Sequence, residues 1–210
     1  MAKIKIQTVK NLPIDSNCFI VFNNLTNNVL IIDPGSQDCS SLVSTLTNSM
    51  ANVEYIILTH EHFDHIWGVN ILKDLYNCKI ICSTECAEKI IDRKKNLSVF
   101  FDQIGFETYG ADIQFDVNRY SFDWNGILVE LVKTKGHSEG SICIIIEDVI
   151  FTGDTIIKDA KTVLKLPDSN RNKLKLSLDL INSICNNNTV IYPGHGDCFV
   201  FENFNIYSCC

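Results

Sequence analysis

The sequence contains no apolar stretch long enough to cross a membrane. The longest candidate runs, residues 127–132 and 141–146, are far shorter than the roughly 18 residues that a spanning helix needs, and the first contains Glu130. Residues 1–11 alternate lysines with apolar side chains and lack the apolar core and cleavage site of a secretory leader. We therefore predict a cytoplasmic protein with no membrane partner.

Positive charge is also scarce. Lys and Arg number 18 against 25 Asp and Glu, which gives a net charge of −7. Nucleic-acid affinity depends on clustered Lys and Arg, and the one basic run, residues 93–95, is typical of a solvated helix end. We expect no nucleic-acid partner, and a small molecule as the substrate.

The ten cysteines include no Cys-x-x-Cys pair, the spacing found in many thiolate zinc sites. Cys209 and Cys210 are expected to be exposed free thiols, which oxidise readily outside a reducing compartment. The other cysteines are expected to be buried, reduced thiols. The clearest examples lie in apolar or amphipathic runs: Cys78, Cys82, Cys86, Cys143 and Cys185.

The 210 residues fit one domain, residues 1–210, because no Pro/Gly/Ser-rich linker divides them. Strand-like runs followed by helical patterns occur twice along the chain, which predicts two sheets with helices outside them. Residues 98–109 are apolar without a clear period. The expected strands are residues 4–9, 18–22, 29–32, 53–58, 79–82, 113–116, 127–132, 142–146, 149–151 and 189–192, and the expected helices are residues 42–50, 66–76, 85–91 and 171–184.

All five histidines lie in short motifs whose composition is typical of metal ligands. The densest is Thr-His-Glu-His-Phe-Asp-His at residues 59–65, at an expected junction of strand and helix. His60 and His62 are two residues apart, so they project to the same side of an extended segment. Asp64 and His65 follow where the chain turns into the helix and are aimed at a second position. One motif therefore predicts ligands for two cations.

Distant ligands must complete these two sites, because a catalytic metal site needs about three protein ligands and an open position. His137, Asp154 and His195 each follow an expected strand and each adjoins glycine, which permits tight backbone turns. The predicted metal ligands are therefore His60, His62, Asp64, His65, His137, Asp154 and His195.

Imidazole and carboxylate donors without thiolate predict two divalent metal ions, with Zn²⁺ as the first choice and Fe, Mn, Co or Ni as alternatives. A carboxylate such as Asp154 can bridge two cations about 3.5 to 4 Å apart and leave a hydroxide between them. We expect this hydroxide to be the nucleophile. Thr59 and Ser138 are expected to hydrogen-bond the ligands or the backbone beside them, and Glu61 is expected to face solvent.

The motif at residues 59–65, with Gly68 after it, resembles the signature of the metallo-β-lactamase fold superfamily. Gly-His-Ser at residues 136–138, Phe-Thr-Gly-Asp-Thr at residues 151–155 and Tyr-Pro-Gly-His-Gly at residues 192–196 are similar to the later motifs of that family, in the same order. The resemblance implies a single-domain, four-layer αββα sandwich with a two-metal site at the sheet edges. It assigns one metal to His60, His62 and His137, the other to Asp64, His65 and His195, and the bridging position to Asp154.

Three shorter motifs resemble the glyoxalase II-like branch, whose members hydrolyse thioesters of glutathione or related thiols. They are Ser-Asn-Cys at residues 16–18, Asp-Pro-Gly at residues 33–35 and Leu-Pro-Asp at residues 166–168. Two features depart from that branch: the helical region that holds glutathione has no counterpart after His195, and residues 158–165 lack a Gly-Arg pair. The thiol and acyl parts of the substrate therefore stay open.

These features together predict hydrolysis of a thioester or ester by a metal-bridging hydroxide, with Asp64 and Asp154 as the catalytic residues. No histidine is left to protonate a leaving group, and a thiolate needs the least protonation. Thioesters are therefore favoured over β-lactams. The alternatives are a mononuclear non-haem iron enzyme acting on a persulfide, a lactonase, and a protein whose metals are purely structural.

Overall fold

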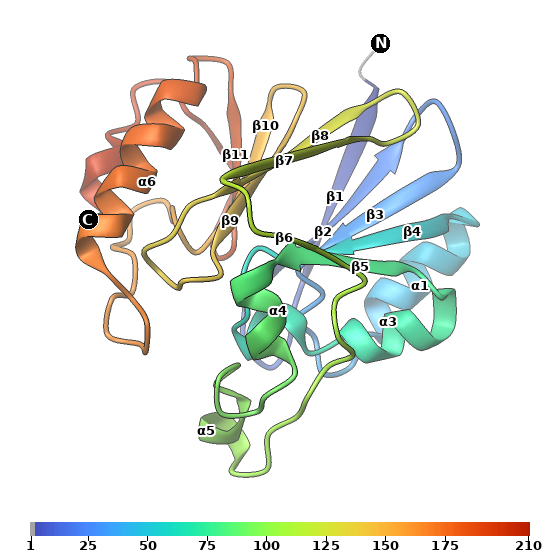
Figure 1. Cartoon of the computed structure of the whole chain (residues 1–210). Coiled ribbons are helices and arrows are strands. Elements are labelled where there is room, and N and C mark those ends of the chain that lie inside the picture. Colours follow the sequence, from blue (N-terminus) through green and yellow to red (C-terminus); the bar gives the residue numbers. More distant parts are fainter. Residues whose placement is uncertain (1–2) are drawn as a thin grey trace.

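Two six-stranded sheets form the centre of the molecule in the computed structural model, which describes residues 3–210. Figure 1 shows helices on the outer sides of both sheets, so the predicted αββα sandwich is confirmed. Residues 1–2 of the predicted domain lie outside the described part. The first sheet has the order β1-β2-β3-β4-β5-β6 and consists of β1 (Ile4–Lys10), β2 (Asn17–Asn23), β3 (Asn28–Ile32), β4 (Asn52–Ile57), β5 (Lys79–Ser83) and β6 (Ile113–Phe115).

The second sheet has the order β12-β11-β10-β9-β8-β7. In the first sheet β3, β4, β5 and β6 pair in parallel, and in the second sheet β10 and β11 do. Parallel pairing brings the carboxyl ends of neighbouring strands to the same edge of a sheet. The strands of the second sheet are β7 (Arg119–Asp123), β8 (Leu128–Lys133), β9 (Ile142–Ile146), β10 (Val149–Gly153), β11 (Val190–Pro193) and β12 (Phe199–Val200).

The longest helix covers the outer face of the second sheet. It begins after Asn170, whose side chain accepts a hydrogen bond from the backbone N–H of Lys173 (3.0 Å). Leu174, Leu178 and Ile181 recur at helical spacing and pack in one buried cluster with residues of β10 and β11. The helices are α1 (Ser40–Ser49), α2 (Phe63–Ile66), α3 (Val69–Tyr76), α4 (Thr84–Ile90), α5 (Ser98–Asp102), α6 (Arg171–Ile184) and the 3-10 turn η1 (Ile206–Cys209).

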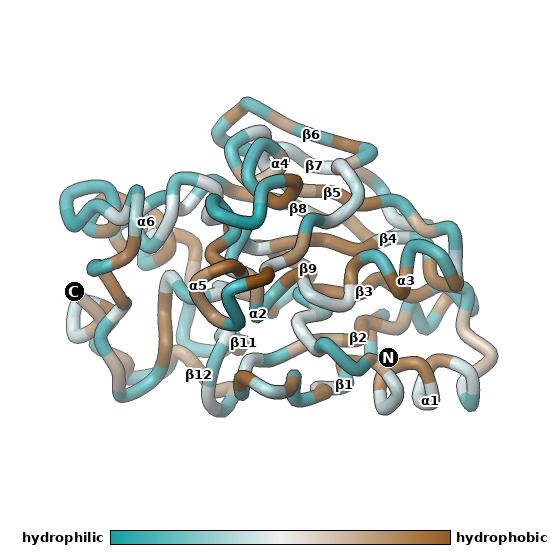
Figure 2. Tube along the Cα trace, turned by 90° about the horizontal axis from the view of Figure 1, so that it is seen from below, coloured by the Kyte–Doolittle hydropathy of each residue, from teal (hydrophilic) through white to brown (hydrophobic). Residues whose placement is uncertain are grey.

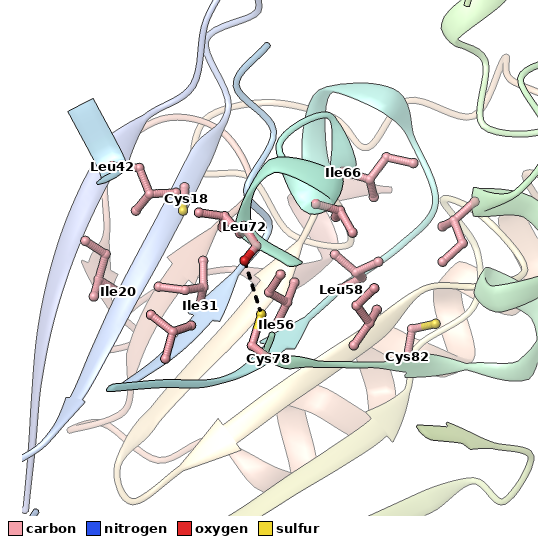
Figure 3. Packing of buried hydrophobic residues seen from close by; sticks show 14 of the residues in the cluster. Cys18, Ile20, Ile31, Leu42, Ile56, Leu58, Ile66, Leu72, Cys78 and Cys82 are labelled. Carbon is pink, nitrogen blue, oxygen red and sulfur yellow. Dashed lines mark hydrogen bonds between the residues drawn. The ribbon is translucent and has the colours of Figure 1, made fainter. Parts of the chain in front are cut away.

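Strand β2 is buried on both faces, which explains its continuous apolar sequence. Cys18 and Ile20 pack on the helices of the first sheet, whereas Phe19 and Val21 pack between the two sheets, because successive strand residues point to opposite faces. Figure 3 shows the helix-side cluster, to which β2 contributes Cys18 and Ile20 and α3 contributes Leu72. Strand β2 thus lies between the outer helices and the second sheet.

Several expected elements differ from the structure. The helix expected over residues 66–76 is divided into α2 and α3 near Gly68, where an added Cβ would lie 2.3 Å from the Cys39 Sγ. Strand β7 was not predicted, because as an edge strand it has no fully buried residue.

Cys209 is buried, so the expectation that Cys209 and Cys210 form an exposed thiol pair is wrong. Among residues 3–210, no helix is long and apolar enough to cross a membrane.

The segment that was ambiguous in the sequence contains the short helix α5. This helix lies apart from both sheets, at the lower edge of Figure 1. Figure 2, a view from below, shows hydrophobic stretches along the chain at α5. The histidine-rich motif follows the end of β4 and runs into α2. The fold therefore places an apolar segment outside the sandwich, on the side of the strand ends.

Candidate active site

Loops at the carboxyl ends of four strands meet at one edge of the sandwich. The histidine-rich motif follows β4 and runs into α2, so the predicted junction of strand and helix is confirmed. His137 follows β8, Asp154 follows β10 and His195 follows β11. The structure brings all seven sequence-predicted ligands together: His60, His62, Asp64, His65, His137, Asp154 and His195.

Three imidazoles form a first group. One ring nitrogen from each of His60, His62 and His137 lies within 4.8 Å of the others, and all three side chains are buried. The Nε2 of His137 is 2.9 Å from the Nδ1 of His62. Burial and the neighbouring imidazoles lower the pKa of His62 to about 3 and lower that of His60 well below its ordinary value. Neutral imidazoles are the form that binds metal cations.

The second group combines a carboxylate with two imidazoles. Ligand atoms of Asp64, His65 and His195 lie within 4.8 Å of one another, and the Nε2 of His195 is 3.3 Å from the Asp64 Oδ2. Burial lowers the pKa of His65 and of His195, but the carboxylates beside them, Asp64 and Asp154, more than offset this and raise both. This group therefore attracts positive charge.

Asp154 lies between the two groups. Its Oδ2 is 3.6 Å from the Nε2 of His137 in the first group and 3.6 Å from the Nε2 of His195 in the second. Its Oδ1 is 3.4 Å from the Nε2 of His65. Burial raises the pKa of Asp154, but the surrounding imidazoles lower it well below its usual value. One ionised carboxylate thus contacts both groups.

Three buried polar atoms of these groups have no hydrogen-bond partner among residues 3–210: His60 Nε2, His65 Nε2 and Asp154 Oδ1. A buried polar atom without a partner costs roughly 1–3 kcal/mol, and in these residues it is a possible ligand atom. Two groups of donors around one carboxylate, each with unsatisfied atoms, fit divalent cations. The donor set contains no thiolate, as predicted.

Asp33 orients both groups, and the sequence analysis assigned it no role. Its Oδ2 accepts hydrogen bonds from the Nδ1 of His65 (2.9 Å) and the Oγ1 of Thr59 (2.5 Å). The Thr59 hydroxyl also lies 3.0 Å from the Nδ1 of His60, so its predicted supporting role is confirmed. Asp33 directly follows β3, which pairs in parallel with β4. This position at a neighbouring strand end is the signal that identifies it.

Glu61 is buried, so the expectation that it faces solvent is wrong. Its Oε1 pairs with the Nζ of Lys89 (2.7 Å), and its Oε2 accepts a hydrogen bond from the hydroxyl of Ser138 (3.0 Å). The same Lys89 also pairs with Asp168 (3.1 Å), a half-exposed residue next to Pro167. The hydroxyl of Ser138 therefore contacts the side chains of Glu61 and Ser141 (2.9 Å), and not a ligand or the backbone as expected.

The loop after β11 is hydrogen-bonded to residues at the start of β2 in the first sheet. The side chain of Asn17 donates hydrogen bonds to the carbonyls of Pro193 and Gly196 (2.8 Å each). The Nδ1 of His195 lies 2.7 Å from the carbonyl oxygen of Asp15. An added Cβ at Gly194 would lie 2.2 Å from the Asp154 Oδ1, so only glycine fits beside that carboxylate. The loop is therefore held close to both groups.

An apolar pocket of about 480 Å³ adjoins the two groups. His62 of the first group and Asp64 of the second are part of its wall. The sequence analysis did not predict it, because its wall combines three separate parts of the chain: the histidine-rich motif, residues 97–101 around α5, and residues 166–167. The lining residues are His62, Phe63, Asp64, Leu97, Phe100, Phe101, Leu166 and Pro167.

Comparisons with known proteins agree with this geometry. The family model of the metallo-beta-lactamase superfamily matches residues 12–195. A probable metallo-hydrolase of Methanocaldococcus jannaschii is 28% identical over 192 residues, which is 87% of this chain and 88% of the relative. A probable polyketide biosynthesis zinc-dependent hydrolase of Bacillus subtilis is 24% identical, over 85% of this chain and 72% of the relative.

A solved structure is also similar over nearly the whole chain. The crystal structure of BLEG-1, a B3 metallo-beta-lactamase, superposes with a TM-score of 0.87 at 25% identity and covers 93% of this chain and 94% of the other. The relatives bear the names metallo-hydrolase and zinc-dependent hydrolase. None of these comparisons is specific to the glyoxalase II-like branch.

Proposed function

Because the chain belongs to the metallo-beta-lactamase superfamily, we propose that it is a hydrolase that cleaves a thioester or ester of a small molecule at a two-metal centre. The observation that carries this proposal is the position of Asp154, whose carboxylate contacts imidazoles of both ligand groups. A single-metal centre would leave one of the two groups without a role.

We propose the ligand sets that the two groups suggest. His60, His62 and His137 would hold one cation, and a second would be held by the remaining group, Asp64, His65 and His195, with Asp154 shared between them. When bound, two divalent cations polarise a carbonyl and lower the pKa of water toward neutrality. Zn²⁺ is the first choice for such donors, with Fe, Mn, Co or Ni as alternatives.

The chain's own carboxylates would do the positioning. Asp64 belongs to the second group and also lines the pocket, so its carboxylate can accept a hydrogen bond from an attacking water beside a bound substrate. Asp33 and Thr59 hold His65 and His60 in fixed orientations, which keeps the ligand groups aligned for the reaction.

The leaving group follows from the histidines. All five are members of the two ligand groups, so no free imidazole is available to protonate an amide nitrogen or an alkoxide. A thiolate leaves without a strong acid. This argument supports a thioester over a β-lactam, although a solved relative is named as a metallo-beta-lactamase.

The test uses full-length protein of measured metal content and one acyl group presented as a thioester, an oxoester, a lactone and an amide. We expect two metal equivalents per chain, fastest turnover of the thioester, and loss of turnover in the His62→Ala variant. Equal rates in both proteins would end the hydrolase proposal. One iron per chain with oxygen uptake on a persulfide would replace it with the dioxygenase alternative, and fastest turnover of the lactone would favour a lactonase.

A further inference from the structure

We infer that the pocket beside the ligand groups binds an uncharged, apolar acyl group of the substrate. This inference rests on the proposed function and names its substrate class. The pocket is continuous with the site, because His62 belongs to the first ligand group, Asp64 belongs to the second, and both line the pocket. A substrate carbonyl placed between the two groups therefore has its acyl substituent at the mouth of this pocket.

The chemistry of the wall selects the occupant. The residues that complete it are Phe63, Leu97, Phe100, Phe101, Leu166 and Pro167, and among the described lining residues there is no Lys or Arg. The ammonium group of Lys89, near this wall, is already paired with Glu61 and Asp168. A negatively charged group would enter the pocket without a cationic partner, which is costly, whereas an apolar chain would lose only its contact with water.

The aromatic part of the wall is anchored rather than loose. The ring of Phe101 lies 5.1 Å from that of Phe63 and 5.6 Å from that of Trp67. Trp67 in turn stacks on Phe106 at 5.2 Å. Phe100, next in the same helix, is 74% exposed. An exposed phenylalanine beside an anchored aromatic cluster can cover an apolar ligand without a large rearrangement.

The backbone of this wall is held in an unfavourable conformation. Leu97 precedes α5 with a φ of 70°, in the left-handed region that a leucine rarely adopts. The side chain of Asn96 fixes this turn, since it donates to the carbonyl of Phe106 (2.8 Å) and accepts from the N–H of Ser98 (2.9 Å). The chain keeps an apolar side chain where glycine would be relaxed, which points to a role for that side chain in the pocket.

The size of the pocket sets the expected range of acyl chains. A volume of about 480 Å³ is within the roughly 300–1,000 Å³ typical of small-molecule sites. Each methylene buried there should raise kcat/KM roughly fourfold until the pocket is full. We therefore expect a medium-length alkyl or aryl acyl group to be preferred over acetyl.

The experiment compares acetyl, butyryl, hexanoyl and octanoyl thioesters of one thiol with a hexanoyl thioester that carries a terminal carboxylate. For the protein as it exists we expect kcat/KM to rise with chain length and the carboxylate to cancel the gain. Phe100→Ala should flatten the series, and Phe100→Lys should make the carboxylate compound the better substrate. Leu128→Ala, at an exposed apolar residue on β8 outside the pocket, is the control and should change neither.

A second measurement separates this inference from the proposed function. Ketones in which a methylene replaces the thioester sulfur cannot be hydrolysed, and their binding is measured by calorimetry. Tighter binding of longer ketones that is weakened by Phe100→Ala supports the pocket assignment even if no thioester is cleaved. Thioester turnover that is independent of chain length, with ketone binding unaffected by Phe100→Ala, would overturn the assignment and leave the hydrolase proposal intact.

Discussion

The two adjoining parts of the site, the ligand groups and the apolar pocket, are built in opposite ways. His65 is completely buried and oriented by Asp33, whereas Phe100 is 74% exposed and lines a hydrophobic wall. Polar groups in the interior need partners of fixed geometry, while apolar side chains at a surface need only shape. The chemistry is therefore constrained by the fold, and the choice of substrate is not.

The largest difference between the two parts should appear when one residue is removed from each. His60→Ala is expected to lower metal content and to reduce kcat/KM more than about 100-fold, beyond the 10–100-fold effect typical of residues that only support ligands. Leu166→Ala, in the pocket wall, should keep its full metal content. The measurements are elemental analysis and steady-state kinetics, and a fully metallated His60→Ala protein would contradict the ligand assignment.

Lys89 lies between the two parts. It pairs with buried Glu61, which belongs to the histidine-rich motif, and with half-exposed Asp168, which follows Pro167 of the pocket wall. Lys89→Met leaves the Glu61 carboxylate buried without its cation, so the free energy of unfolding should fall by about 3 kcal/mol. Asp168→Asn is the matched control and should change it by less than about 1 kcal/mol, because exposed ion pairs contribute little. Urea unfolding measures both, and equal losses would show that burial does not distinguish the two partners.

Asp33 tests whether orientation alone matters in the buried part. Asp33→Asn keeps the size of the side chain and removes the charge that His65 and Thr59 contact. We expect metal affinity or activity to fall roughly 10–100-fold. Asp38→Asn, at an exposed carboxylate in the same segment, is the control. Competition with a chelator gives the affinity, and unchanged affinity in Asp33→Asn would exclude an orienting role.

Substitutions of Leu97, in the pocket wall, have the smallest expected effect, and they test whether the backbone of that wall is strained. Leu97→Gly and Leu97→Ala both remove the side chain from the wall, but only glycine relaxes the left-handed backbone. The glycine variant should be more stable than the alanine variant by about 1 kcal/mol. Both should lose the preference for longer acyl groups. An alanine variant as stable as the glycine variant would mean that the turn stores no strain.

The same contrast explains which features the sequence could predict. The gathering of the candidate ligands was predictable because His60, His62 and His65 lie in one local motif and the distant candidates follow strand ends beside glycine. The role of Asp33 depends on the parallel register of β3 and β4, which periodicity does not give. The fold class followed from strand and helix periodicity and from the resemblance.

Burial of a charged residue and the shape of a wall were harder to predict. The sequence predicts that Glu61 faces solvent, because its partners Lys89 and Ser138 are distant in sequence and meet it only in the folded structure. The pocket depends on Leu97 adopting a conformation against its own preference. Both errors arise where long-range packing overrides local propensity. Cytoplasmic localisation and the absence of a nucleic-acid partner stay predictions.

The hydrogen bonds of Asn17 have a consequence for folding. Its side chain reaches the carbonyl of Gly196 across 179 residues of sequence, and closing so long a loop costs chain entropy that only a late, cooperative step can repay. We therefore expect the segment around His195 to reach the other candidate ligands late in folding, after both sheets have assembled. The rate of cation binding would then report the final stage of folding. A partly folded chain would expose at most a weak, incomplete binding site.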